Sequence, residues 1–342
     1  MNKKPFPAAS RVACIVLPLV LLLTACSGQH KLANDIQDYQ QRLAAVLNVP
    51  SQDLQKPTLA PFPSIKLLKK DIPATTIKLA DFYALKNCQL STLVAQRNTA
   101  LGRTQYPSAR YQYEVELLEE IERCLLNKEN SEISATLSSW QQQKQNNLPL
   151  VWANLLQISD EVKLALSANS GFIQGTEKDG INQTLQAFEY LSRLLASPQS
   201  NSSDLEQHLA NLKSYQLPAR MWRSQSLLTD NLTHITQWLE HNSTLMKCPS
   251  GKASTEVNYL QNVFQLFFVE KIQPVATKIN HYQYQLTSVL ETIANTPHTN
   301  PLIKNMLIKH TQQNFTDYKM SIQTHIQFWQ KLYKRCGITP NG

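Results

Sequence analysis

The chain has few of the residues and motifs that mark common enzyme and metal sites. It has 8 glycines in 342 residues, and its one glycine-rich stretch, 171–180, lacks the GK[ST] ending of a phosphate-binding loop. No CxxC, HExxH or GxSxG motif occurs, so we expect no metal site, no cofactor and no motif-defined serine nucleophile. An alternating apolar pattern of useful length is also missing, which argues against β-architecture. These absences leave catalysis without local support and do not exclude it.

The N-terminal segment resembles a bacterial lipoprotein signal. Three basic residues precede an apolar run at residues 12–23, which is too short to span a bilayer. The run ends in Leu-Thr-Ala-Cys, a lipobox-like tetrapeptide in which Cys26 would be acylated after removal of residues 1–25. The alternative is an ordinary secretory signal cut near Ala25, with Cys26 left as a free thiol.

Acylation at Cys26 would determine where the protein resides. One acyl chain binds a membrane marginally, whereas two or more give stable attachment. Lipoproteins kept in the inner membrane of Gram-negative cells typically carry Asp after the acylated cysteine, and this chain carries Ser27. We therefore expect a lipid anchor in the outer membrane, with the folded part facing the periplasm.

The charge of the mature chain is modest. The signal takes three basic residues and no acidic ones, which leaves 30 Lys and Arg against 25 Asp and Glu. These basic residues are scattered and do not form a stripe with interleaved aromatics, so we expect no nucleic-acid partner. The excess is compatible with nearby anionic lipid or cell-wall material.

The remaining cysteines indicate an oxidising compartment. Cys88, Cys124, Cys248 and Cys336 form an even set, which predicts two disulfides in one of three pairings. We favour Cys88 with Cys124, because these residues lie on two successive predicted helices of one hairpin, and Cys248 with Cys336 by default. Metal ligation is the rival interpretation, but the spacing does not favour it.

Apolar spacing predicts an all-α fold, a bundle of long antiparallel helices with an extended proline-rich crossing segment. We divide the chain into the signal peptide (1–25), the lipidated N-terminus and first helix (26–49), the proline-rich segment (50–75) and a helical bundle domain (76–342). Within the bundle domain, steps of three and four residues predict helices at 81–99, 108–126, 131–144, 149–168, 181–196, 203–214 and 219–247, a long helix from 257 that is kinked at Pro274, and a last helix capped by Asn300.

The predicted 108–126 helix is dense in acidic residues. We expect its glutamates to spread over a solvated face, paired with Arg110 and Arg123 at helical spacing. The other interpretation is that Glu114 or a neighbouring acid serves an envelope enzyme acting on cell wall or lipid, since paired carboxylates carry out glycoside hydrolysis.

Residues 93–103 and 107–114 resemble the distinctive block of an uncharacterised gammaproteobacterial lipoprotein family, a domain of unknown function, and the resemblance implies no established activity. Arg97 and Asn98 precede a glycine turn, and Arg110, Tyr113 and Glu114 begin the helix that folds back. The simpler interpretation is that Arg97 and Asn98 cap the turn and pair with Glu114. The sharper one is that all five form a recognition site at the hairpin tip.

We therefore expect a non-enzymatic, lipid-anchored envelope protein that binds or scaffolds an unknown envelope protein or cell-wall component in a groove between long helices.

Overall fold

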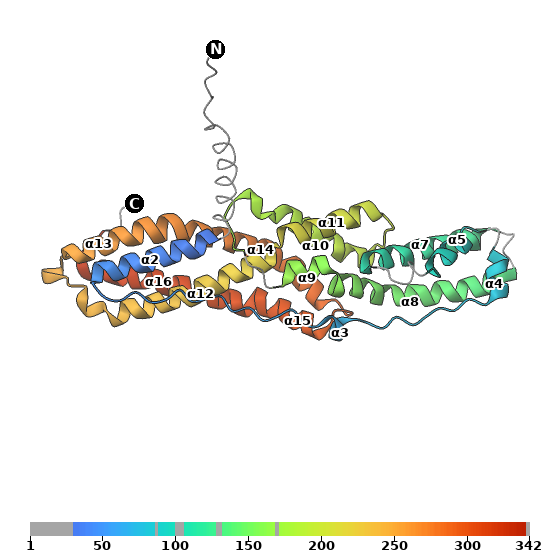
Figure 1. Cartoon of the computed structure of the whole chain (residues 1–342), viewed down its shortest axis with the longest axis horizontal. Helices are drawn as coiled ribbons and strands as arrows, with labels where there is room; N and C mark the ends of the chain where they lie inside the picture. The colour runs from blue at the N-terminus through green and yellow to red at the C-terminus, as the bar shows by residue number, and fades with distance from the viewer. Residues whose placement is uncertain (1–29, 86–87, 100–105, 128–131, 168–170, 340–342) are drawn as a thin grey trace, which may run out of the picture.

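The protein is a long rod of helices (Figure 1). The computed structural model describes residues 30–85, 88–99, 106–127, 132–167 and 171–339, and these contain no strand. The all-α prediction is confirmed. The α-helices are α2 (Lys31–Leu47), α3 (Ile65–Leu68), α4 (Leu79–Ala84), α5 (Leu90–Arg97), α7 (Pro107–Leu126), α8 (Ser134–Ile158), α9 (Asp160–Leu166), α10 (Ile181–Ala196), α11 (Ser202–Tyr215), α12 (Leu217–His241), α13 (Thr255–Val263), α14 (Gln273–Asn295), α15 (Pro301–Ile308) and α16 (Asn314–Cys336).

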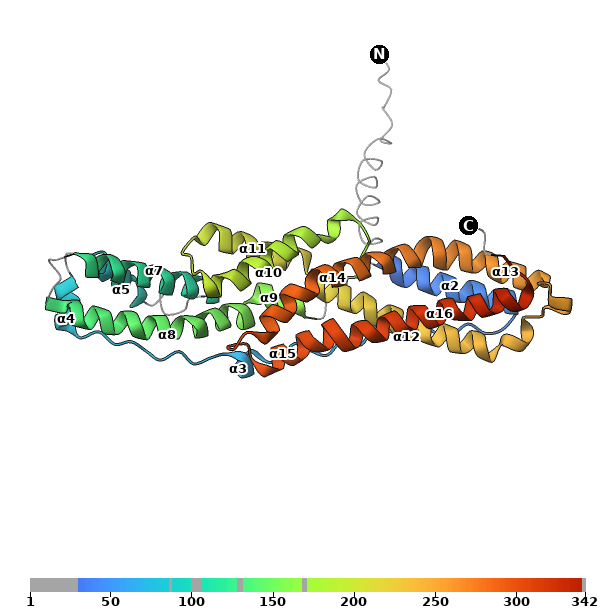
Figure 2. The same ribbon diagram turned by 180° about the vertical axis from the view of Figure 1, so that it is seen from behind.

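Two apolar cores divide the rod. The larger core fills the body, where α12 packs along α16 and also contacts α2 and α14. The smaller core lies at the far end, between α5, the second half of α7 and the first half of α8, and we call this part the tip lobe. In Figures 1 and 2 the tip lobe is the end that carries the labels α4, α5 and α7.

Helix α2 is packed into the body by a polar contact as well as by its apolar stripe. The Tyr39 hydroxyl lies 2.9 Å from Nε2 of His325, and the Thr236 hydroxyl lies 2.9 Å from its Nδ1. All three residues are buried. Because both ring nitrogens have a hydrogen-bond partner, burial of the imidazole leaves no nitrogen unsatisfied.

The proline-rich segment is extended except for the four-residue α3, and it runs from the body to the tip lobe (Figure 2). We call residues 48–78 the strap. Asn231 accepts from the backbone N–H of Gln55 and donates to its carbonyl, both at 2.9 Å. Asn154 does the same to Lys70, at 2.7 and 2.8 Å. An extended segment interrupted by prolines cannot pair its own backbone N–H and C=O groups. Side-chain amides of the body and of α8 provide hydrogen-bond partners for some of them.

Several predicted boundaries are wrong near prolines and caps. The predicted 81–99 helix is two shorter helices, α4 and α5, whereas the pieces at 131–144 and 149–168 join across Pro149 into α8, which ends at Ile158 before the short α9. Ser108 is buried inside α7, which begins at Pro107 instead of being capped by Ser108. Asn300 caps α15 as expected, since its side chain accepts from the N–H of Leu302.

Two π-helical stretches interrupt the C-terminal helices. Phe264–Ile272 precedes the predicted kink at Pro274, and Lys309–Gln313 separates α15 from α16. Proline lacks the N–H that would bond to the carbonyl four residues back, so a wider turn before Pro274 accommodates the missing bond.

Two disulfides join Cys88 to Cys124 and Cys248 to Cys336, the pairing that the helix positions favoured. The first lies in the tip lobe, and the second joins the end of α16 to the segment after α12. Disulfides of this kind indicate an oxidising compartment outside the cytoplasm.

Within the described part of the chain, none of the helices combines the length and apolarity needed to cross a bilayer. Cys26 and the rest of the predicted signal and lipobox lie outside the described residues, so the lipid anchor stays a prediction.

Candidate functional site

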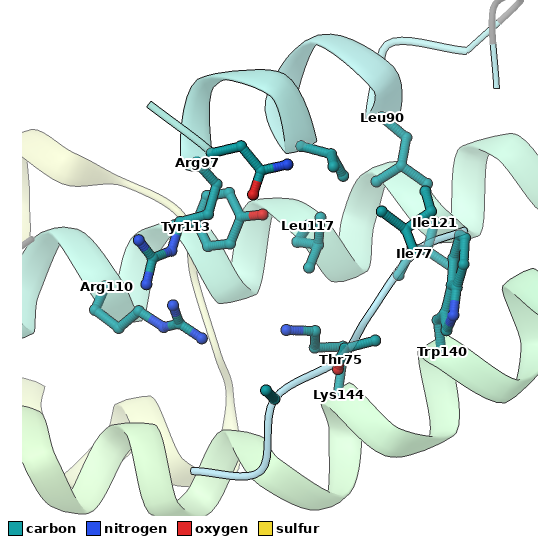
Figure 3. Close-up of a pocket in the computed structure, with 13 residues that line it drawn as sticks. Thr75, Ile77, Leu90, Arg97, Arg110, Tyr113, Leu117, Ile121, Trp140 and Lys144 are labelled. Carbon is teal, nitrogen blue, oxygen red and sulfur yellow. The ribbon is translucent and has the colours of Figure 1, made fainter. Parts of the chain in front are cut away.

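A cavity of about 280 Å³ opens in the tip lobe. Helices α5, α7 and α8 and the last part of the strap surround it (Figure 3). Four of the five residues predicted for recognition line this cavity, namely Arg97, Asn98, Arg110 and Tyr113. Among the described residues, the lining is made by Ala74, Thr75, Ile77, Leu90, Val94, Arg97, Asn98, Arg110, Tyr113, Leu117, Ile121, Trp140 and Lys144.

The lining is polarised from one end to the other. Figure 3 shows the guanidinium groups of Arg97 and Arg110 beside Tyr113 at one end, and the apolar side chains at the other. The apolar end is made by Ile77, Leu90, Ile121 and Trp140. We call this cavity, with its basic end and its apolar end, the tip pocket.

Glu114 lies behind the basic end and is 1% exposed. It forms ion pairs with Arg110, one turn back on α7, and with Lys144 of α8, whose Nζ lies 3.0 Å from Oε2. The expectation that Glu114 lies on a solvated face is wrong. Position 114 is on the side of α7 that packs against α8, and a buried carboxylate requires the opposite charges that it finds there.

The other glutamates of α7 divide between surface and interior. Glu120 is buried at 7% exposure and pairs with Arg123, as does the more exposed Glu119 at 3.5 Å. The predicted Arg123 pairing is confirmed, and so is the exposure of Glu116 and Glu122. The acid-rich face is therefore only partly solvated.

Tyr113 holds the two arginines of the basic end. The guanidinium carbons of Arg97 and Arg110 lie 5.9 and 5.7 Å from the centre of its ring, within the range of cation–π attraction. Burial raises the pKa of Tyr113 to about 12, and the nearby Glu114 charge adds to the effect. The phenol is thus neutral at physiological pH and can donate a hydrogen bond.

Within the described lining of the tip pocket, two buried side-chain atoms stand without a hydrogen-bond partner in the protein. They are Nε of Arg110 and the hydroxyl of Thr75, and both atoms are buried. Asn98 has a structural role: its backbone N–H bonds to the carbonyls of Val94 and Ala95 at the end of α5. The capping interpretation of Asn98 therefore holds for its backbone, while its side chain lines the pocket.

The sequence analysis missed the residues that come from outside the hairpin. Lys144 and Trp140 lie on α8, and Thr75 and Ile77 lie on the strap. Their only sequence signals were an apolar stripe and a proline-rich composition, which do not indicate what a segment packs against. Glu114, the fifth predicted residue, is not part of the lining and forms ion pairs with Arg110 and Lys144, which are.

A second cavity, of about 210 Å³, lies in the body between α12, the strap and the π-helical stretch Lys309–Gln313. His310 stacks on Trp222 there, with ring centres 4.0 Å apart. Burial lowers the pKa of His310 to about 4, so its ring is neutral near pH 7. In the described residues, no group of three or more His, Cys, Asp or Glu could hold a metal ion.

The fold and the tip pocket define an elongated all-α protein with two disulfides and a polarised pocket at one end. The chain belongs to the family described as "Protein of unknown function (DUF3080)", whose model matches residues 36–340. Comparison with curated proteins gives no match, and comparison with solved structures gives none either.

Proposed function

We propose that the protein is a lipid-anchored binding protein of the bacterial envelope, which holds a small envelope component in the tip pocket. Acylated Cys26 would attach it to the outer membrane, with the rod in the periplasm. The lipobox-like tetrapeptide supports the anchor, and the two disulfides support the compartment. The observation that carries the proposal is the polarised lining of the tip pocket.

The lining favours binding because its parts are held in place by contacts within the protein. Tyr113 positions both arginines, and Glu114 positions Arg110 and Lys144. The Cys88–Cys124 disulfide joins α7 to the segment before α5. In a preorganised site, less of the binding free energy is lost to the ordering of side chains.

The same contacts weigh against the alternative of an envelope enzyme. A general acid or base must reach the substrate atom with which it exchanges a proton. Glu114 faces two cations and does not line the pocket. We therefore assign it the role of positioning the basic end.

Labelling and fractionation test the anchor. Cells expressing the full chain are fed an alkyne analogue of palmitate, and the wild type is compared with Cys26→Ala. Wild-type protein should carry the label and sediment with outer membranes, whereas the variant should lose both. An unlabelled wild type, or a wild type in the cytoplasmic fraction, would contradict the proposal.

Photo-crosslinking in intact cells tests the site. An amino acid with a small aliphatic diazirine side chain, close in size to isoleucine, replaces Ile77 at the tip pocket or, as the matched control, exposed Met320 on the body. We expect an adduct with an envelope component from position 77 and none of the same mass from position 320. Equal adducts from both positions, or no adduct from position 77, would refute the assignment of the site.

A further inference from the structure

The charges around the basic end of the tip pocket do not cancel. Arg97, Arg110 and Lys144 line it, and Glu114 is the carboxylate paired with two of them. The formal charges of these four groups sum to +2, and exposed Glu116, whose charge also acts on Tyr113, lowers the local charge to about +1. Lys144 and Arg110 keep little contact with water, since their side chains are 10% and 23% exposed. Charges held in so poorly solvated a place attract an anion more strongly than surface charges do.

The donors at this end suit an oxyanion. Nε of Arg110 and the Thr75 hydroxyl are buried and have no partner, and a buried donor without a partner is costly. A guanidinium group matches the geometry of a carboxylate or a phosphate with two parallel hydrogen bonds. Neutral Tyr113 can add a further donor.

The opposite end suits a short apolar chain. Ile77, Leu90, Ile121 and Trp140 present no charge there. The cavity of about 280 Å³ has space for on the order of ten non-hydrogen atoms, at the ~30 Å³ that one water molecule takes in the liquid. This is at or below the small end of the usual range for ligand pockets, about 300–1,000 Å³. A cavity of this size encloses a short chain and its head, and any longer part of a ligand would lie outside it.

We infer that the tip pocket binds a small amphipathic anion, a carboxylate or phosphate head on a short alkyl chain, with the head at Arg97, Arg110 and Lys144 and the chain against Ile77 and Trp140. This inference rests on the proposed function, because it names the ligand class of that site. The head could belong to a free fatty acid or to a lipid phosphate, and the two share the chemistry that the pocket recognises.

Calorimetry with the wild-type pocket gives the first test. The mature chain from residue 26, carrying Cys26→Ser so that no detergent is required, is titrated with octanoate and octyl phosphate. Acetate and inorganic phosphate serve as heads without a chain, and octan-1-ol and octyltrimethylammonium as chains without an anion. At least one octyl anion should bind about tenfold or more tighter than its head alone and than octan-1-ol. The tighter of the two octyl anions identifies the source of the head.

Two pairs of variants locate the binding. Arg110→Gln should weaken binding of the octyl anions about tenfold and leave binding of octan-1-ol unchanged. The control is Arg123→Gln, because Arg123 lies on the same helix and its side chain is 61% exposed. This control should change the binding of neither the octyl anions nor octan-1-ol. Ile77→Ser should weaken octyl anions and leave acetate unchanged, with exposed Leu79→Ser as its control. Circular dichroism shows whether each variant is folded. If Arg110→Gln does not fold, the ligand series measured on the wild-type pocket still tests the inference.

The outcomes separate the ligand class from the proposed function. Equal binding of octanoate and octan-1-ol, preferential binding of octyltrimethylammonium, or equal binding of octanoate and acetate would each overturn the amphipathic anion. If any of these occurs while Cys26 is acylated and position 77 still captures an envelope component, only the ligand class is wrong. If octyl anions bind as expected but the chain is unlabelled and cytoplasmic, the ligand class stands and the envelope function fails.

Discussion

Replacing Glu114 by Gln should destabilise the protein and, at the same time, tighten its binding of anions. The substitution keeps the size of the side chain and removes its charge. Arg110 and Lys144 then face each other at the basic end of the tip pocket without their shared carboxylate. The two effects have one cause, since the cations that lose their internal partner are the ones that an external anion would meet.

The magnitude follows from burial. Removing one partner of a buried ion pair typically costs about 3–5 kcal/mol, because the other charge stays buried without compensation. Glu114 is 1% exposed, but the Arg110 side chain is 23% exposed and can regain some water. We therefore expect a loss at the lower end of this range, about 3 kcal/mol. This is a large part of a typical free energy of unfolding, which is ~5–15 kcal/mol. The tip pocket gains one unit of positive charge, so octanoate should bind about tenfold tighter.

Urea unfolding and hydrogen exchange measure the cost and its location. Glu122→Gln is the matched control, because Glu122 is an exposed glutamate on the same helix. Wild type and control should unfold alike, and Glu114→Gln should unfold at lower urea with faster exchange in α7 and α8. A loss of stability below about 1 kcal/mol, or weaker binding of octanoate by the folded variant, would refute the reasoning.

Three further perturbations test the body, the strap and the tip lobe. Asn154→Leu removes two hydrogen bonds to the backbone of Lys70. Urea unfolding should show a loss of about 2 kcal/mol in the free energy of unfolding, and hydrogen exchange in the strap should become faster. Unchanged exchange in the strap would contradict the role assigned to Asn154. Burial lowers the pKa of His325 to about 3, so only the unfolded state takes up its proton between pH 6.5 and 3. Stability, measured by urea unfolding at stepped pH, should therefore fall by roughly 1.4 kcal/mol for each pH unit below 6.5, and less steeply in His325→Asn; equal slopes would refute this. Replacing Cys88 and Cys124 by Ser opens a loop with a sequence separation of 36, which chain-entropy reasoning values at about 4 kcal/mol; a Tm shift below about 2 °C would contradict it.

Local sequence signals predicted those parts of the fold that depend on local physics. The prolines of residues 50–73 predicted a segment without helix, which is extended except for the four-residue α3, and Asn300 and Pro301 marked the start of α15. The same reasoning failed at Pro149, where a break was expected. Its neighbours Leu148, Val151 and Trp152 are buried in the body core, and this packing holds one helix across the missing hydrogen bond. Tertiary contacts outweighed a local signal.

The candidate site divides in the same way. Arg97, Arg110 and Tyr113 could be predicted together because α5 and α7 follow each other in the chain and pack together, so that residues close in sequence meet. Glu114 is buried instead of solvated, and its second cationic partner is Lys144, thirty positions further along the chain. An i to i+4 pair with Arg110 is equally compatible with an exposed helix face and a buried one, and only the position of α8 decides between them. Acidic residues on a predicted helix therefore indicate a solvated face only if no second helix packs on it, and that is a property of the whole fold.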